Sequence, residues 1–162
     1  MLIEACRLGP VLDLACGYGR HSLAAARLGL PVLALDRDEE ALRCLQRSAP
    51  PGLQCVRTDL ETGSGLPLAP ASCGAILVFR FLYRPLAPAI VEALRPGGLL
   101  LYETFTIHQR EIGRGPRNPA FLLDSNELPR LFSALRVIAY EEVVSEGPPR
   151  EALARLAARK SL

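Results

Sequence analysis

Short apolar runs alternate with segments of helical spacing along the first two thirds of the chain. The runs cover residues 11–14, 32–35, 53–56, 75–79 and 99–102, and each has the length of a buried strand. Segments with helical spacing lie between them, at 22–28, 38–49 and 85–94. Because strands that alternate with helices connect through right-handed crossovers, the pattern predicts a parallel sheet covered by helices on both faces.

The last third of the chain departs from this rhythm. Residues 106–123 combine glycine, proline and arginine without apolar periodicity, and a loop of that length in a compact domain is usually functional or disordered. Residues 124–127 have the sequence Asp-Ser-Asn-Glu, which is typical of a helix N-terminus, and residues 137–140 predict a sixth strand. Residues 151–158 are rich in alanine and locally favour a helix.

The first apolar run leads directly into a turn with two glycines. Gly17 and Gly19 permit backbone angles and close approach that a side chain would block. A helix that begins near Ser22 aims unpaired N–H groups and the positive end of its dipole at whatever fills the turn. The arrangement predicts the nucleotide side of a doubly wound sheet, holding a ligand with an anionic or acceptor-rich end.

Four motifs together carry a resemblance to a known family. They are Asp13-Leu14-Ala15-Cys16-Gly17-Tyr18-Gly19, Asp36 at the end of the second run, Asp59-Leu60 after the third, and Leu94-Arg95-Pro96-Gly97-Gly98 before the fifth. In this order the chain resembles the class I S-adenosylmethionine-dependent methyltransferases. The stretches 80–85, Arg-Phe-Leu-Tyr-Arg-Pro, and 102–105, Tyr-Glu-Thr-Phe, are most similar to small bacterial methyltransferases of the tellurite-resistance type.

The resemblance implies a single domain over residues 1–162. Its fold class is α/β, with a doubly wound, mostly parallel seven-stranded Rossmann-like sheet whose last strand is antiparallel. We therefore predict that residues 151–158 form that strand, against their local helix propensity. Only nine residues precede Pro10, too few for the helices that cover the cofactor in many such enzymes. Some other segment must then close the site, and loop 106–123 is the candidate lid.

The cofactor that the resemblance implies is S-adenosylmethionine. Asp36 would accept both ribose hydroxyls, Asp59 would accept from the adenine amino group, and Asp13 would face the methionine amino group. Alternatively, Asp36 caps the helix that begins at Asp38, Asp59 is a plain turn residue, and Asp13 only pins the loop. The full predicted set comprises Asp13, Ala15, Cys16, Gly17, Tyr18, Gly19, His21, Asp36, Arg37, Asp59, Leu60 and Phe79.

The methyl acceptor is expected outside the carboxyl ends of the fourth and fifth strands. Arg80, Tyr83 and Arg84 follow the fourth strand, Tyr102 and Glu103 end the fifth, and His108 lies on the irregular loop. The predicted catalytic residues are Tyr83, Arg84 and His108, whereas His21 is expected to be neutral and structural. The arginines of these segments favour a small anionic acceptor, although they fit an exposed arginine-rich loop equally well.

Two alternative interpretations of the glycine turn remain. A nicotinamide dinucleotide also uses a glycine-rich turn and an acid on the second strand, but Asp13 would repel its pyrophosphate. A non-catalytic module that binds adenosylmethionine or adenosylhomocysteine would carry the same motifs. The predicted reaction is in-line methyl transfer to a small molecule, in which the protein supplies mainly proximity and orientation.

Composition and charge narrow the classes of partner. A net charge of +2 gives no argument for nucleic acid, and no apolar run approaches the length of a membrane span or a signal peptide. A cytoplasmic protein without a membrane partner is therefore expected. The five cysteines show no spacing of a zinc site, so we expect reduced thiols and no metal. The oligomeric state stays open.

Overall fold

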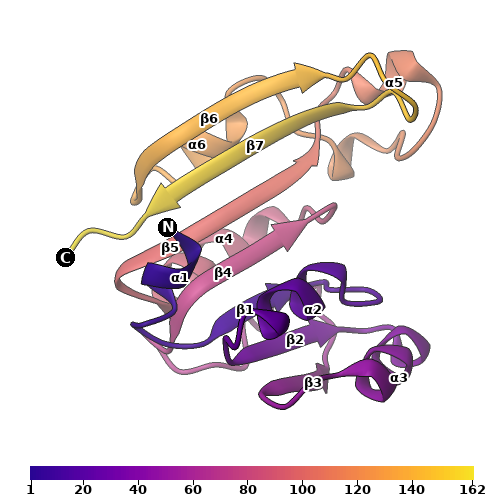
Figure 1. Ribbon diagram of the computed structural model, residues 1–162. Coiled ribbons are helices and arrows are strands. Elements are labelled where there is room, and N and C mark those ends of the chain that lie inside the picture. Colours follow the sequence, from indigo (N-terminus) through magenta and orange to yellow (C-terminus); the bar gives the residue numbers. More distant parts are fainter.

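The computed structural model describes residues 1–162 and contains one seven-stranded sheet with the order β3-β2-β1-β4-β5-β7-β6 (Figure 1). The strands are β1 (Val11–Leu14), β2 (Val32–Asp36), β3 (Leu53–Arg57), β4 (Cys73–Phe79), β5 (Leu94–Phe105), β6 (Arg136–Val144) and β7 (Ala152–Arg159). The first five are parallel, and β7 runs antiparallel to both of its neighbours. The predicted doubly wound α/β fold with an antiparallel last strand is confirmed.

Eight short helical elements connect the strands. They are α1 (Leu2–Ala5), α2 (Arg20–Arg27), α3 (Glu39–Ser48), the 3₁₀ turn η1 (Arg84–Leu86), α4 (Ala87–Ala93), α5 (Gln109–Ile112), the 3₁₀ turn η2 (Pro119–Phe121) and α6 (Glu127–Leu131). Each falls short of the length and hydropathy that a membrane-spanning helix requires. Asp38 caps α3, because its carboxylate accepts the N–H groups of Glu40 and Ala41.

The helices cover the two faces of the sheet unequally. On one face, α4 and α6 bury the main core, in which Ile90 and Leu128 pack with residues of β1, β4, β5 and β7. On the other face, α1 and α2 form two smaller clusters over β1, β4 and the start of β5. Helix α1 packs on β4 and β5, whereas the outer part of that face, over β7 and β6, carries no helix (Figure 1). The predicted cover by helices on both faces therefore does not extend to β6 and β7.

Strand β7 shows how tertiary pairing overrides local preference. Its alanine-rich sequence forms a ladder with β5 on one side and with β6 on the other. Ala152, Ala154, Leu156 and Ala158 are buried in the process. Hydrogen bonds on both edges and burial of the apolar side chains outweigh a helix propensity of at most about 1 kcal/mol per residue.

The start of α6 differs from the prediction of a side-chain cap. Its N-cap residue, Asn126, is in the left-handed region with φ of 57°, and no side chain caps the first turn. Instead, the carboxylate of Glu127 reaches back and accepts the N–H of Asp124 at 2.8 Å. A capping box has two hydrogen bonds between side chain and backbone, and only the one accepted by the glutamate side chain is present here.

Residues 106–123 form an ordered excursion rather than a structureless loop. Thr106 and Leu123 pair as an isolated parallel bridge, so the two ends of the loop lie side by side. The buried side chain of Gln109 accepts the N–H of Ala152 at 2.7 Å and donates to the carbonyl of Arg114 at 2.8 Å. These bonds attach the loop to the start of β7, and its shape is that of a packed Ω-loop.

Candidate active site

Two neighbouring cavities lie at the carboxyl edge of the parallel strands. The larger has a volume of about 350 Å³ and is lined by Ala15, Asp36, Arg37, Thr58, Asp59, Leu60, Glu61, Arg80, Phe81, Leu82, Thr104, Phe105, Pro116 and Phe121. The smaller has about 230 Å³ and is lined by Asp13, Ala15, Cys16, Gly17, Arg20, His21, Phe79 and Arg80. The two share Ala15 and Arg80, so they adjoin each other at the end of β1 and β4.

The turn between the cavities depends on left-handed backbone at three positions. Ala15, Gly17 and Gly19 have φ values of 52°, 53° and 74°. A Cβ atom at Gly19 would lie 2.4 Å from a methyl carbon of Leu45, so this glycine also lets the turn pack against α3. Ala15 adopts the same region with a side chain, at a cost of about 1–2 kcal/mol. The sequence placed the turn correctly, but not the strain at Ala15.

Asp36 links the second strand to this turn. One carboxylate oxygen accepts the N–H of Gly17 at 2.7 Å, and the other accepts the N–H of Asp38 at 2.9 Å. Asp36 thus has the structural role that was the alternative to ribose binding, because it holds the start of the segment at Asp38. Because each carboxylate oxygen accepts more than one hydrogen bond, Asp36 keeps capacity for ligand hydroxyls in the larger cavity.

Asp59 lies in the loop after β3, and this loop lines one end of the larger cavity. One of its oxygens accepts the N–H of Glu61 at 2.9 Å, and the chain supplies no hydrogen-bond donor to the other. Glu61 pairs with Arg37 at 2.6 Å across the mouth of the same cavity. The predicted residues Asp36, Arg37, Asp59 and Leu60 are therefore brought together around one space.

Asp13 is almost fully buried beside the smaller cavity, with 1 % of its surface exposed. The hydroxyl of Ser22 donates to its carboxylate at 2.5 Å. Burial raises the pKa of Asp13 to about 6, against the opposing effect of the Ser22 hydrogen bonds. A cationic group in the smaller cavity would favour the ionised carboxylate. The hydrogen bond between Ser22 and Asp13 could not be predicted from the sequence, because the two residues lie nine positions apart and no motif links them.

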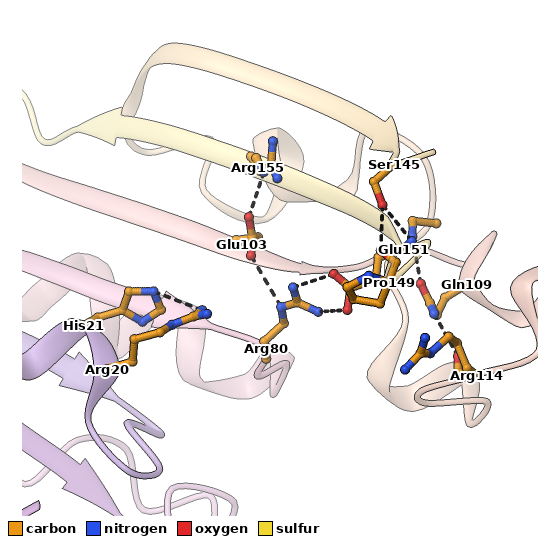
Figure 2. A network of polar contacts seen from close by, with 11 residues as sticks. Arg20, His21, Arg80, Glu103, Gln109, Arg114, Ser145, Pro149, Glu151 and Arg155 are labelled. Atoms are coloured by element: carbon orange, nitrogen blue, oxygen red, sulfur yellow. Dashed lines mark hydrogen bonds and ion pairs between the residues drawn. The ribbon is translucent and has the colours of Figure 1, made fainter. Parts of the chain in front are cut away.

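His21 packs against Phe79 in the smaller cavity. The two rings stack with their centroids 3.8 Å apart and an interplanar angle of 26°. Burial lowers the pKa of His21, and the nearby guanidinium of Arg20 lowers it further (Figure 2). Both effects favour the neutral imidazole ring of His21.

Arg80 stands at the junction of the two cavities within a network of ion pairs (Figure 2). Its guanidinium donates two hydrogen bonds of 2.7 Å to the carboxylate of Glu151 and lies 3.4 Å from Glu103. It also lies 4.7 Å from the ring centroid of Phe105. Glu103 is shared with Arg155 at 2.7 Å. The sequence offered no signal for Glu151, which lies 71 positions from Arg80.

The three predicted catalytic residues do not line either cavity. Arg84 donates to Glu127 and to the carbonyls of Ala120 and Leu122, which anchors the loop before α6. His108 is half exposed and lies 3.7 Å from Glu111 in a separate depression. Tyr83 precedes η1, and its hydroxyl lies next to Gly63.

Two of the tyrosines named in the sequence lie away from both cavities. The hydroxyl of Tyr102 donates to the carbonyl of Phe81 at 3.0 Å, and burial raises its pKa well above the usual range. Tyr102 is therefore a core residue. Tyr18 is 64 % exposed and lines neither cavity. Conversely, Phe121 and Pro116 border the larger cavity, and nothing in the sequence pattern pointed to Phe121.

Residues 11–98, more than half of the chain, match the family described as methyltransferase domain. The chain belongs to this family. The match covers β1 to β4 and the whole glycine turn, so the residues around both cavities up to Leu82 lie within it. No curated protein sequence matches this methyltransferase significantly.

Solved structures share the fold of this methyltransferase over nearly its whole length. An S-adenosylmethionine-dependent methyltransferase from Mesorhizobium loti superposes with a TM-score of 0.77 at 20% identity, covering 97% of this chain and 96% of its own. One from Methanosarcina mazei gives 0.74 at 18%, covering 94% and 92%. TehB from Haemophilus influenzae gives 0.72 at 20%, covering 99% of this chain and 61% of its own. These similarities confirm the predicted fold.

Proposed function

We propose that this methyltransferase uses S-adenosylmethionine as its donor and methylates a small molecule bound beside the donor. The observation that carries the proposal is the pair of adjoining cavities with acids at both ends. Asp36 and Asp59 lie in one cavity and Asp13 in the other, with Ala15 and Arg80 at their junction. A donor with a polar nucleoside at one end and an ammonium group at the other matches this division of charge.

The residues present fit such a donor. Asp36 has unused acceptor capacity for ribose hydroxyls, and the free oxygen of Asp59 suits an adenine amino group. The buried carboxylate of Asp13 would hold the ammonium group, while Arg20 and His21 line the same cavity and suit the carboxylate. When bound, the donor supplies a methyl carbon already activated by the sulfonium. By the same argument, the acids of both cavities disfavour the pyrophosphate of a dinucleotide.

The chain itself would contribute orientation to the transfer. The left-handed turn and Asp36 fix the nucleoside end, and the junction at Ala15 and Arg80 sets where the acceptor meets the donor. Holding two reactants in line converts the step into an effectively intramolecular one. Because Tyr83, Arg84 and His108 line neither cavity, we assign Arg84 to anchoring the loop and assign no general base.

The acceptor is proposed to be a small molecule, without the anionic character that the arginine-rich segments suggested. Both arginines that line the larger cavity are already paired, Arg80 with Glu151 and Arg37 with Glu61. The loop arginines Arg110, Arg114 and Arg117 do not line it. An anion would therefore have to displace a carboxylate to gain a cation.

Calorimetry with adenosylhomocysteine and NAD tests the donor site. We expect adenosylhomocysteine to bind and NAD not to bind. Replacing Asp59 by Ala should weaken adenosylhomocysteine by about 10- to 100-fold, because a hydrogen bond to a charged group is lost. Turnover of labelled donor with any acceptor separates the enzyme from a non-catalytic binding module. NAD binding tighter than that of adenosylhomocysteine would refute the proposal.

A further inference from the structure

The two ends of the larger cavity differ in chemical character. Five polar residues at or after the carboxyl ends of β2 and β3 line one end: Asp36, Arg37, Thr58, Asp59 and Glu61. Apolar residues from β5, the segment after β4 and the loop before α6 line the other: Phe81, Leu82, Phe105, Pro116 and Phe121. Three of the five phenylalanines of the chain thus border one space.

The sheet order keeps these ends apart. Strands β3 and β5 are separated by β2, β1 and β4, so their carboxyl ends lie about 19 Å from each other at the usual strand spacing. If the donor occupies the acids near β2 and β3, as proposed above, the apolar end remains for the acceptor. The inference that follows therefore rests on the proposed function.

The apolar end offers no unpaired cation or anion. The guanidinium of Arg80 is held by Glu151 and Glu103 (Figure 2). It also lies over the ring of Phe105. The remaining polar side chain at this end is that of Thr104, which is neutral. An acceptor bound here meets aromatic rings and one hydroxyl.

Phe121 is held at the rim of this end by its own backbone. Its side chain is 44 % exposed and borders the cavity. The carbonyls before and after it, those of Ala120 and Leu122, accept hydrogen bonds from Arg84 at 3.0 and 2.8 Å. Arg84 is itself paired with Glu127, so the backbone on both sides of the ring is held at the rim before any ligand arrives.

We propose that the acceptor is a small planar aromatic molecule that carries a thiol or hydroxyl group, with its ring against Phe105 and Phe121. Its sulfur or oxygen atom would face the junction at Ala15 and Arg80. A lone pair on that atom forms the new bond to the methyl carbon as the carbon–sulfur bond of the donor breaks. The electron pair of the broken bond stays on the donor sulfur, and the acceptor proton passes to water.

Binding of matched probes tests this inference without relying on activity. Calorimetry in the presence of adenosylhomocysteine compares phenol with cyclohexanol, a saturated ring of similar size that is also uncharged at neutral pH, and with the tellurite anion. We expect phenol to bind about fivefold more tightly than cyclohexanol, because aromatic pairs add to the burial of area. Equal binding of the two rings, or tighter binding of tellurite, would overturn the inference.

Two variants locate the aromatic contact. Phe121→Ala should weaken phenol binding about tenfold and raise the KM for phenol in the methylation assay, while the affinity for adenosylhomocysteine stays unchanged. Phe105→Ala should act in the same direction. Ile138→Ala, which removes an exposed apolar side chain on β6 away from both cavities, should leave phenol binding unchanged.

The outcomes separate this inference from the proposed function. If the unmodified protein binds adenosylhomocysteine but Phe121→Ala and Phe105→Ala leave phenol binding unaltered, the acceptor class is wrong and the donor site stands. If the protein does not bind adenosylhomocysteine at all, the proposed function fails, and the acceptor class fails with it.

Discussion

The N–H group of Gly17 donates to the carboxylate of Asp36 at 2.7 Å, across 19 positions of sequence. The bond joins the glycine turn after β1 to the end of β2, and Asp36 also accepts the N–H of Asp38 at 2.9 Å. Asp36, for which ribose binding and a capping role were both open, therefore holds the glycine turn and the start of the segment at Asp38 together. Its substitution acts on folding and on binding together.

Asp36→Ala should destabilise the unliganded protein and weaken adenosylhomocysteine. Two backbone N–H groups lose a charged acceptor, which costs about 1–3 kcal/mol of unfolding free energy. Urea unfolding measures the first effect and calorimetry the second. Asp59→Ala serves as the comparison, because Asp59 accepts one backbone N–H and should affect mainly binding. Unaltered stability of Asp36→Ala would show that the turn holds without this bond.

Ala15→Gly should stabilise the protein by about 0.5–1 kcal/mol. Relief of the left-handed strain, about 1–2 kcal/mol, exceeds the entropic penalty of glycine, about 0.5–1 kcal/mol. Ala71 has φ of 49° and lines neither cavity, so Ala71→Gly is a matched control. Both variants should unfold at higher urea concentration. Only Ala15→Gly should change the affinity for adenosylhomocysteine, and destabilisation of either variant would contradict the argument.

Asp13 should make stability depend on pH between about 4 and 6. Burial raises its pKa from 3.8 to about 6, so the folded state holds a proton that the unfolded state releases. Stability is therefore lost as pH rises through this window, by about 2–3 kcal/mol. Comparing unfolding of the unmodified protein and Asp13→Asn at pH 4 to 8 isolates the contribution. Parallel pH profiles of the two would count against a raised pKa.

The same carboxyl group should tie ligand binding to pH. Below pH 6 Asp13 becomes protonated and loses its attraction for the ammonium group of adenosylhomocysteine. The affinity should fall on acidification in the unmodified protein and change little in Asp13→Asn. Calorimetry at pH 5 and pH 7.5 measures both. An affinity that rises on acidification would place the ammonium group elsewhere.

Lys160, the only lysine of the chain, should stabilise the end of α4 without touching the site. Its ammonium group donates to the carbonyls of Val91 and Leu94, each at 2.8 Å. Lys160→Met leaves these groups unpaired and should cost about 1–2 kcal/mol of unfolding free energy. Adenosylhomocysteine affinity should not change. Arg150→Met, an exposed residue before β7, is the control and should have no effect on stability.

Local chemistry was enough to predict which acids and glycines lie at the carboxyl edge of the parallel strands. Asp13, Gly17, Gly19, Asp36 and Asp59 each directly follow or lie within an apolar run, and parallel strands bring such ends to one edge of the sheet. Their positions along the chain therefore translate into positions in space. The same logic predicted β1 to β4 closely, because buried parallel strands are continuous apolar runs.

The acceptor side depended on contacts between distant segments. Arg80 and Arg84 stand four residues apart, yet Glu151 draws one to the cavity junction and Glu127 draws the other to the loop. Which arginine meets which carboxylate is decided by the packing of β7 and α6. The hydrophobic periodicity of the chain carries no information about this pairing.

The sequence by itself determined where the strands lie along the chain and which acids follow them, because both are encoded within a few residues. Only the tertiary structure decided that residues 152–159 pair as a strand and that Phe121 borders the cavity, because both depend on partners many positions away.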